Sequence, residues 1–535
     1  MKTKDKVFYS DFGAVGDGIA NDFAAIKAAH AYANENNLPV FADQGATYYI
    51  GKTGGEIAFV KTDTDWTGAN FIIDDRDVFP NDPERRAAIF QIMPDYEEIT
   101  INATDDTPAG AAIKAINATA KDNDGVIFKM DDCPTIDLGL GYPAMLILYN
   151  KNVKQYIRYG GNADNGQDQH EVVLVDKNGK VDPSTAILHD YKELTHIIVK
   201  RLDDKQITLK GGVFTTRANC APEQYAYYSR CIRIHRPNLK VVGVKHYITD
   251  EGEHGNPYIA FLHIVTTGNI VVEDCVLTAH RTYDCMSTAW VTPQGSYDIR
   301  LENSCNVLIH NVTQSNFFHS TEDGTPEGLI TLAKNARGFY NWGIMCSNYC
   351  KNLTYDHCKL TRFDAHCGTY NPTIRNSEVG MLSIIGGGKF ELINSTVYMK
   401  ENCLFLLRND YGSTFSGDVI IKDVTFKSLH EGEDFYIAKT FHYNHFFGYK
   451  CYMPQNITID NLVIESPSET KKVNIYFGQG TTINDIHKDI LNGEKNVNPV
   501  VPTQKVFIKN NKEGYEFVHP KPLSNVFENL EFVYE

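Results

Sequence analysis

The sequence lacks features that would point to nucleic acid or to a membrane. It has no excess of positive charge, because 51 lysines and arginines face 67 aspartates and glutamates, which gives a formal net charge of −16. Nucleic acid and anionic membrane surfaces repel such a chain, so neither is an expected partner. It also has no apolar run approaching the ~18 residues that a membrane-spanning helix requires.

The cysteines lack order. The twelve cysteines have no regular spacing, which fits a reducing compartment better than a disulfide framework. No paired spacing of cysteines and histidines marks a zinc site, so no metal ligand set is expected. The first residues, MKTKDKVFYSDFG, contain no apolar signal core. The chain as written is therefore expected to be cytoplasmic, or secreted if a leader peptide has been removed.

A repeated pattern explains the length of the chain. Compact cores usually stop near ~250 to 300 residues unless the architecture grows by repetition, and this chain has 535. Copies such as 269-NIVVEDCVL-277 and 389-KFELINSTV-397 each combine a strand of alternating apolar residues with a polar residue, usually Asn or Asp. The equivalent polar positions are Gly243, Asp274, Asn311, His357, Asn376, Asn394, Asp423 and Asn461.

The repeat predicts an all-β solenoid. No helical segment separates the strands, as a βαβ fold would require. Steps of unequal length fit the coils of a parallel β-helix that carries inserted loops. A β-sandwich is the alternative, since it would also supply many short strands. Asn at a fixed turn position favours the solenoid, because its side chain can bond its own backbone and stack on the Asn of the next coil.

The opening stretch 11-DFGAVGDGIANDFAAIKAAHAYA-33 places a glycine loop before an alanine-rich helix. It lacks the Lys-Ser/Thr of a Walker loop and the preceding strand of a dinucleotide fold, so the loop is interpreted as structural. Asn21 and Asp22 are expected to cap a helix over 23–36.

This run also carries a family resemblance. Asp11-Phe12-Gly13-Ala14, Gly16-Asp17-Gly18, Asn21-Asp22, Ala25-Ile26 and Tyr48-Tyr49-Ile50 together resemble the N-terminal signature of the pectate-lyase-like, single-stranded right-handed β-helix superfamily, which includes polysaccharide-active enzymes and phage tailspikes. The resemblance implies a right-handed parallel β-helix whose N-terminal helix covers the open end of the solenoid.

Four segments are expected along the chain. They are an N-terminal cap with the first coil (1–75), an inserted, less regular subdomain (76–195), the β-helix coils (196–466) and a C-terminal cap (467–535). The acidic run 104–132 could bind Ca²⁺, although it lacks the twelve-residue loop pattern. No other cofactor is expected, and assembly into a homo-oligomer is left open.

The resemblance implies a carbohydrate-active enzyme. Equivalent residues on successive coils lie ~4.8 Å apart, and counting ten residues on from the aligned turns brings Glu253 and Asp284 to one edge, with Asp364 just short of it. Sugar hydrolysis needs two carboxylates that flank the glycosidic bond. We therefore expect a glycoside hydrolase or related glycosyl-transferring enzyme, with Asp364 and either Asp284 or Glu253 as its working pair.

Further candidate residues surround Asp364. Arg362, Asp364 and His366 share a period of two, so in an extended strand they would point the same way. The loop 407–418 places more polar groups on a rigid scaffold, where function concentrates. We expect His366 and Asp410 to take part in catalysis. The residues expected to bind an oligo- or polysaccharide are Arg362, Arg408, Trp342, Tyr411, His246 and Arg281.

Two other functions stay open. A polysaccharide lyase removes the proton α to a uronate carboxyl group and needs a cationic clamp, which Arg281, Arg362, Arg375 and Arg408 could form. A glycan-binding tailspike or adhesin would need no catalytic group, but its long, slender C-terminal region has no counterpart in 467–535. The Gly-His-Gly of polygalacturonases is absent, so that particular activity is not expected.

Overall fold

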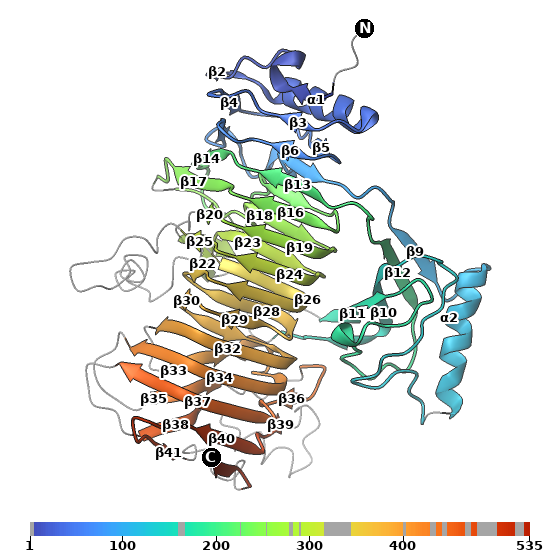
Figure 1. Ribbon diagram of the computed structural model, residues 1–535, viewed down its shortest axis with the longest axis vertical. Coiled ribbons are helices and arrows are strands. Elements are labelled where there is room, and N and C mark those ends of the chain that lie inside the picture. Colours follow the sequence, from blue (N-terminus) through green and yellow to red (C-terminus); the bar gives the residue numbers. More distant parts are fainter. Residues whose placement is uncertain are drawn as a thin grey trace.

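The structure, a computed structural model, describes residues 5–122, 124–158, 166–224, 226–252, 254–277, 282–287, 290–314, 344–399, 403–428, 435–440, 447–465, 472–478, 500–518 and 529–535. A long stack of strands forms the main body, and a smaller body with its own sheet lies beside it (Figure 1). Within these ranges the only α-helices are α1 (Phe23–Asn36) and α2 (Pro108–Ala118), so the prediction of a mostly β fold is confirmed. Neither helix is long and apolar enough to span a membrane.

The stack is built from coils of parallel strands. In one coil β18 (Leu262–Val265), β19 (Gly268–Glu273) and β20 (Val276–Leu277) pair in parallel with β23 (Tyr297–Glu302), β24 (Cys305–His310) and β25 (Thr313–Gln314) of the next. Alternate side chains, such as those of Ile270 and Val272, point inward and are buried. They join one apolar core that runs the length of the stack.

The same pairing continues along the whole stack. The strands before the smaller body are β1 (Val7–Phe8), β2 (Asp17–Asn21), β3 (Val40–Phe41), β4 (Thr47–Ile50), β5 (Ala58–Val60), β6 (Thr64–Asp65), β7 (Asn70–Asp74) and β8 (Phe90–Ile92). The remaining strands after it are β13 (Ile207–Lys210), β14 (Val213–Arg217), β15 (Ile232–Ile234), β16 (Leu239–Val242), β17 (Lys245–Thr249), β26 (Ile344–Asp356), β27 (Lys359–Leu360), β28 (Phe363–Tyr370), β29 (Thr373–Arg375), β30 (Glu378–Val379), β31 (Leu382–Ile384), β32 (Gly386–Met399), β33 (Cys403–Leu407), β34 (Phe415–Ser428), β35 (Phe435–Thr440), β37 (Asn456–Glu465), β38 (Lys472–Gly478), β40 (Lys505–Lys509), β41 (Glu516–Val518) and β42 (Glu531–Tyr534). Two short strands, β36 (Cys451–Tyr452) and β39 (Val500–Val501), form a separate parallel pair.

The polar turn positions form ladders. All eight positions aligned from the sequence have φ between 44° and 70°, the left-handed region that Asn, Asp and Gly tolerate best. Asn394 Nδ2 donates to Asn376 Oδ1 at 2.8 Å, and Asn461 Nδ2 donates to Asp423 Oδ1 at 2.7 Å. A second ladder that the sequence analysis did not predict links Asn238, Asn269, Asn306, Asn352 and Asn371. The predicted stacking of Asn on Asn is therefore confirmed.

The α1 helix lies at the N-terminal end of the stack (Figure 1) and buries Phe23, Ile26 and Ala33. Its cap differs from the prediction in one respect. Asn21 Oδ1 accepts a hydrogen bond from the Phe23 N–H at 3.2 Å, as expected, but the Asp22 carboxylate turns back to accept from Val15 N at 2.6 Å. Asp22 thus holds the glycine loop, which supports the interpretation of that loop as structural.

The smaller body is inserted between β8 and β13. It contains the antiparallel strands β9 (Ile99–Asn102), β10 (Ala144–Gln155), β11 (Gln167–Val175) and β12 (His196–Arg201), in the order β11-β10-β12-β9, and an apolar cluster of its own to which Ile113 of α2 belongs. We call it the inserted subdomain. Strands β6, β7 and β8 pair directly with β13, β14 and β15, so the stack resumes where it stopped.

A buried ion pair fixes the inserted subdomain to the stack. Lys351 Nζ on β26 lies 2.8 Å from Glu171 Oε2 on β11, and the two side chains are 1% and 2% exposed. The same ammonium donates to the carbonyls of Thr185 at 3.1 Å and Ala186 at 2.9 Å, both in the subdomain. All three of its N–H groups therefore have acceptors, so the subdomain holds a set position against the coils.

The coils continue beyond residue 466, where the sequence analysis placed the start of a C-terminal cap. Strands β38, β40, β41 and β42 pair in parallel with their predecessors, and β42 ends at Tyr534. The repeat is hard to see there because the paired residues are far apart: Asn456 pairs with Lys505.

Candidate functional site

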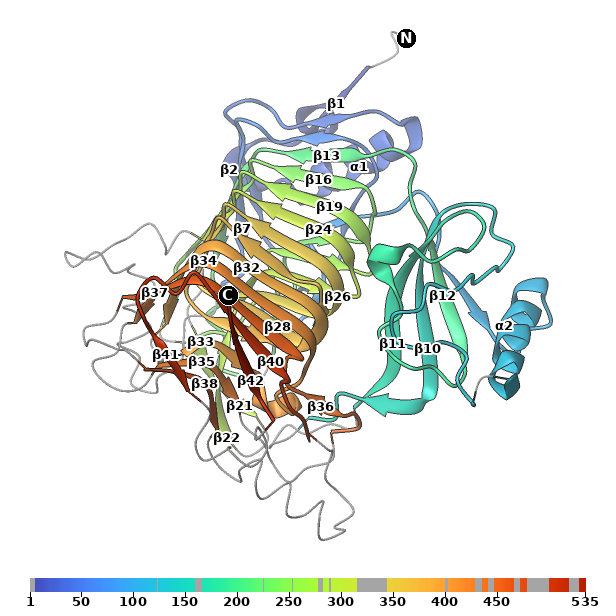
Figure 2. The same ribbon diagram turned by 60° about the horizontal axis from the view of Figure 1, so that its bottom comes forward.

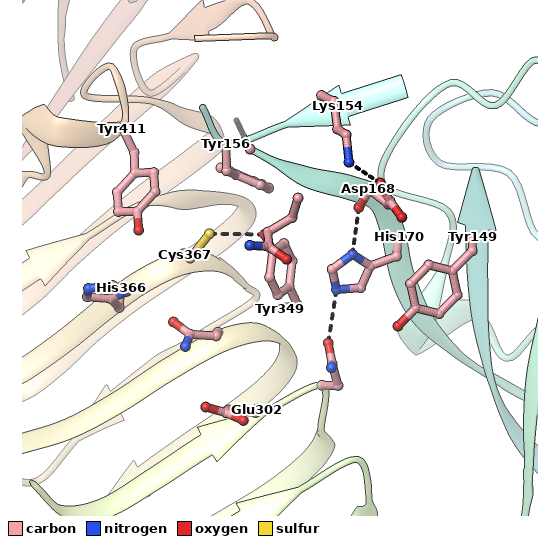
Figure 3. A pocket seen from close by; sticks show the side chains of 14 residues that line it. Tyr149, Lys154, Tyr156, Asp168, His170, Glu302, Tyr349, His366, Cys367 and Tyr411 are labelled. Carbon is pink, nitrogen blue, oxygen red and sulfur yellow. Dashed lines mark hydrogen bonds and ion pairs between the residues drawn. The ribbon is translucent and has the colours of Figure 1, made fainter. Parts of the chain in front are cut away.

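A cavity of about 450 Å³ lies where the inserted subdomain meets the stack (Figure 3). We call it the seam cavity. The subdomain side contributes Tyr149, Lys154, Tyr156, Gly166, Gln167, Asp168 and His170. The stack contributes Glu302, Asn303, Asn348, Tyr349, His366, Cys367 and Tyr411. The site thus combines segments that are far apart in the sequence.

His170 is fixed at the subdomain wall of the seam cavity. Its Nδ1 lies 2.8 Å from the Asp168 carbonyl oxygen, and its Nε2 lies 3.1 Å from Asn303 Oδ1 on the stack. The ring stacks on Tyr149 with 5.0 Å between centroids and lies 4.0 Å from the ring of Tyr349. Burial lowers the pKa of His170.

Glu302 supplies an ionised carboxylate on the stack wall. It ends β23 and pairs with the Arg300 guanidinium, and His263 Nε2 lies 3.6 Å from its Oε2. Burial alone would raise the pKa of Glu302, but His263 and Arg300 together lower it to about 2. The side chain is 25% exposed, which leaves the carboxylate accessible from the cavity.

Tyrosines form much of the remaining surface. The Tyr156 ring lies 5.5 Å from Tyr349 and 6.4 Å from Tyr411, centroid to centroid. Burial raises the pKa of all three phenols, so each keeps its proton. Aromatic faces combined with hydroxyl groups suit a ligand that is apolar on one side and polar at its edges, as a sugar ring is.

The charged residues predicted around Asp364 form a network behind this wall. Arg362 Nη2 donates to Asp364 Oδ2 at 2.8 Å, and Arg408 Nη1 lies 3.0 Å from both carboxylate oxygens. Arg408 also pairs with Asp410, whose Oδ2 accepts from Arg158 Nε at 2.7 Å. Burial alone would raise the pKa of Asp364, but Arg362 and Arg408 hold it well below its usual range.

His366 and Tyr411 connect this network to the seam cavity. Both line the cavity, and their rings meet edge to face at 5.6 Å. The Arg158 and Arg408 guanidinium carbons lie 5.6 Å and 5.7 Å from the centroid of the Tyr411 ring. Burial and the charge of Arg408 hold the pKa of His366 well below its usual value, so the imidazole is neutral.

Six of the predicted site residues thus lie together, namely Asp364, His366, Asp410, Arg362, Arg408 and Tyr411. The Asp364 side chain is 1% exposed and is not among those lining the cavity. His246 is buried elsewhere, with its ring stacked on Phe261 at 3.9 Å and its Nε2 at 2.9 Å from Thr216 Oγ1.

The other predicted residues fall where less is described. Asp284 belongs to the hairpin of β21 (Thr282–Ser287) and β22 (Trp290–Gly295), but its side chain lies outside the described part of the chain. Glu253, Arg281 and Trp342 lie outside the described residues altogether.

Sequence reasoning missed Glu302 and the whole subdomain wall. Glu302 carries a usable signal, because it ends a strand just before a turn of the second Asn ladder. Asp168, His170 and Tyr149 carry none, since nothing in the irregular segment 76–195 indicates which coils it meets.

One further cluster has metal-ligand chemistry. Among the described residues, His310, Asp356 and His357 place ligand atoms within 4.8 Å of one another. The Asp356 carboxylate already accepts from Asn376 Nδ2 at 2.8 Å and pairs with Arg375 Nη2 at 3.1 Å. Its charge is therefore balanced by Arg375, and none of the three residues lines the seam cavity.

The low pKa of Glu302 predicts a pH-dependent contribution to stability. A carboxyl group whose folded pKa is depressed stabilises the fold above its unfolded pKa, and it loses that effect as the pH falls through the folded pKa. We expect wild type to be more stable than Glu302→Gln at neutral pH, and the difference to shrink as the pH falls from 4.5 toward 2. Urea unfolding across this range measures it. A pH-independent difference would contradict the ion-paired state.

Comparisons with known proteins concern the fold. No protein-family model and no curated protein sequence matches the chain. Among solved structures, the tailspike gp61 of Pseudomonas phage phi297 is 12% identical with a TM-score of 0.48, covering 96% of this chain and 81% of its own. The Streptococcus pneumoniae surface protein and adhesin PfbA is 11% identical with a TM-score of 0.42, covering 99% and 97%.

A third similar structure was solved with a ligand. The Gp54 tailspike of Acinetobacter baumannii bacteriophage AP22, in complex with A. baumannii capsular saccharide, is 10% identical with a TM-score of 0.43, covering 98% of this chain and 79% of its own.

Proposed function

We propose that the chain is a carbohydrate-active protein of the right-handed parallel β-helix type, which binds an oligo- or polysaccharide in the seam cavity and cleaves its glycosidic bonds by hydrolysis. The observation that carries the proposal is the lining of this cavity, which brings four tyrosines together with the ionised Glu302 carboxylate and the imidazoles of His170 and His366. Ring faces bind sugars by packing, and polar groups between them fix the orientation.

Glu302 is the proposed ionised member of the catalytic pair. A glycosidase needs one carboxylate that attacks the sugar or activates water, and one carboxylic acid that protonates the leaving oxygen. Arg300 and His263 keep Glu302 in the first state. Asp284 and Glu253 stay the predicted candidates for the catalytic acid. A bound Ca²⁺ and assembly into a homo-oligomer also stay predictions.

Asp364 takes a positioning role in this proposal. It is buried between Arg362 and Arg408, so it holds Arg408 beneath Tyr411 without reaching the substrate. Asp410 holds Arg158 on the other side of the same ring. The network keeps cationic charge behind the wall while Tyr411 and His366 face the ligand.

A specific observation also favours β-elimination as a second candidate. Elimination needs a neutral base, a proton donor and a cation near the uronate carboxylate. His366 is neutral, Tyr411 keeps its proton, and Arg408 lies against the Tyr411 ring. The Arg408 guanidinium is already paired with Asp364 and Asp410, so it is less able to bind a uronate carboxylate. We therefore rank elimination second.

Incubating the purified protein with neutral and uronate-containing glycans tests the proposal. New reducing ends without absorbance from unsaturated uronates are the expected result, since they indicate hydrolysis. Reducing ends that appear together with this absorbance would indicate elimination instead. Saturable binding without cleavage would leave a binding protein, and neither binding nor cleavage across the panel would contradict the proposal.

A further inference from the structure

Two more cavities continue the seam cavity along the stack. The second, of about 280 Å³, shares Tyr156 with the seam cavity. The third, of about 370 Å³, shares Met130, Tyr370, Ser416 and Tyr452 with the second. Because each cavity shares lining residues with the next, the three form one row. Residues of the inserted subdomain, which lies beside the coils (Figure 2), line all three cavities.

The row is long compared with a single sugar. It can be followed through paired residues of successive coils, from Glu302 to Asn348, from Asn348 to Cys367, from Thr369 to Gly386, from Gly386 to Phe415, from Asp418 to Asn456, and from Asn456 to Lys505. These six steps, at ~4.8 Å each, span about 29 Å along the stack.

Tyrosines continue along the whole row. Tyr156 lies 4.9 Å from Tyr449, centroid to centroid, and its hydroxyl is hydrogen-bonded to that of Tyr370. Tyr370 and Tyr452 line both the second and the third cavity. Between them the floor is partly the backbone of Gly386, Gly388 and Gly417, which project no side chain into the row.

The charged residues that line the row bear on whether an acidic or a neutral glycan can bind there. Among the described residues that line it, the acidic ones are Asp168, Glu302, Asp190, Asp131 and Asp418, and the only lysines and arginines are Lys154 and Lys450. Lys154 is itself paired with Asp168, and the described lining of the third cavity has two aspartates and no lysine or arginine. Like charges at close range repel, so a chain of uronates is disfavoured along this surface.

We infer that the three cavities are consecutive subsites for one extended glycan built from neutral or amino sugars, with the second and third binding units beyond the seam cavity. The inference rests on the proposed function. It adds that affinity grows with chain length until the row is filled, because each new unit meets another part of the tyrosine-lined surface.

Tyr452 offers the sharpest test of the additional subsites, because it lines the second and third cavities but not the seam cavity. The full chain and its Tyr452→Ala variant are titrated with neutral, N-acetylated and uronate-containing oligosaccharides graded in length. We expect wild type to prefer the longer neutral or amino-sugar chains, and Tyr452→Ala to weaken their binding by up to about tenfold, the effect of one aromatic contact. Binding of the shortest ligands stays unchanged.

Controls separate this inference from the proposed function. Tyr247→Ala removes an exposed tyrosine of β17 outside the row and is expected to change nothing. Tyr452→Phe keeps the ring and is expected to retain binding of long chains. Binding that is independent of length, insensitive to Tyr452→Ala or strongest for uronate chains would overturn the inference and leave the proposed function standing. No glycan binding or cleavage at all would remove both.

Discussion

Replacing Glu302 with Gln is expected to lower kcat/KM for glycan cleavage by about 10²- to 10⁴-fold, the usual contribution of a catalytic acid or base. The amide keeps the size of the side chain but can neither attack the sugar nor accept a proton from water. Because Glu302 ends a strand and is 25% exposed, the coil itself needs no rearrangement. Steady-state rates on the best substrate of the glycan panel measure the effect.

Glu273→Gln provides the matched control. Glu273 also ends a strand of the stack, β19, and pairs with Lys240, but it lines none of the three cavities. Its replacement is expected to leave kcat/KM unchanged. A Glu302→Gln protein that cleaves as fast as this control would remove Glu302 from the catalytic pair.

Replacing Lys351 with Met is expected to lower the free energy of unfolding by about 3 to 5 kcal/mol, because it leaves the Glu171 carboxylate buried without its partner. Glu171 Oε2 then still accepts a hydrogen bond from the Leu188 N–H at 2.9 Å, but no cation balances its charge. The carbonyls of Thr185 and Ala186 lose their donor at the same time. Urea unfolding at neutral pH measures the change.

Two further variants show whether the loss of stability comes from the unpaired buried charge. Lys27→Met breaks an exposed pair with Glu56, whose side chains are 40% and 55% exposed, and such pairs contribute roughly 0 to 1 kcal/mol. The double variant Lys351→Met, Glu171→Leu removes both buried charges and is expected to recover much of the lost stability. A Lys351→Met protein as stable as Lys27→Met would show that the pair does not anchor the subdomain.

The coils were predictable from sequence because their signals are local. Alternating apolar residues and a polar residue at the turn recur in each coil, and the left-handed turn conformation favours Asn, Asp or Gly, which occupy seven of the eight aligned positions. The eight aligned positions from Gly243 to Asn461 accordingly all have positive φ. Past residue 466 the same signals are separated by long segments, so the repeat could not be recognised in the sequence although the coils continue.

The site was predictable only in part, because it joins segments that no local pattern relates. Arg362, Asp364 and His366 could be grouped through their spacing within one strand. Their neighbour Arg158 lies about two hundred residues earlier in the chain, where no repeat exists, and it meets Asp410 only through the folded structure. The sequence also did not indicate which of these side chains are buried. Asp364 is buried, so it lies behind the cavity wall and not at its surface.

The uninterrupted pairing of β6, β7 and β8 with β13, β14 and β15 makes the inserted subdomain a replaceable module. The scaffold on either side already matches, so a different insertion could be grafted between Ile92 and Ile207 without altering the register of any coil. Half of the seam cavity would change with it, while Glu302, His366 and Tyr411 would stay in place. Under the proposed function, such an architecture would let glycan preference diversify through one exchangeable segment.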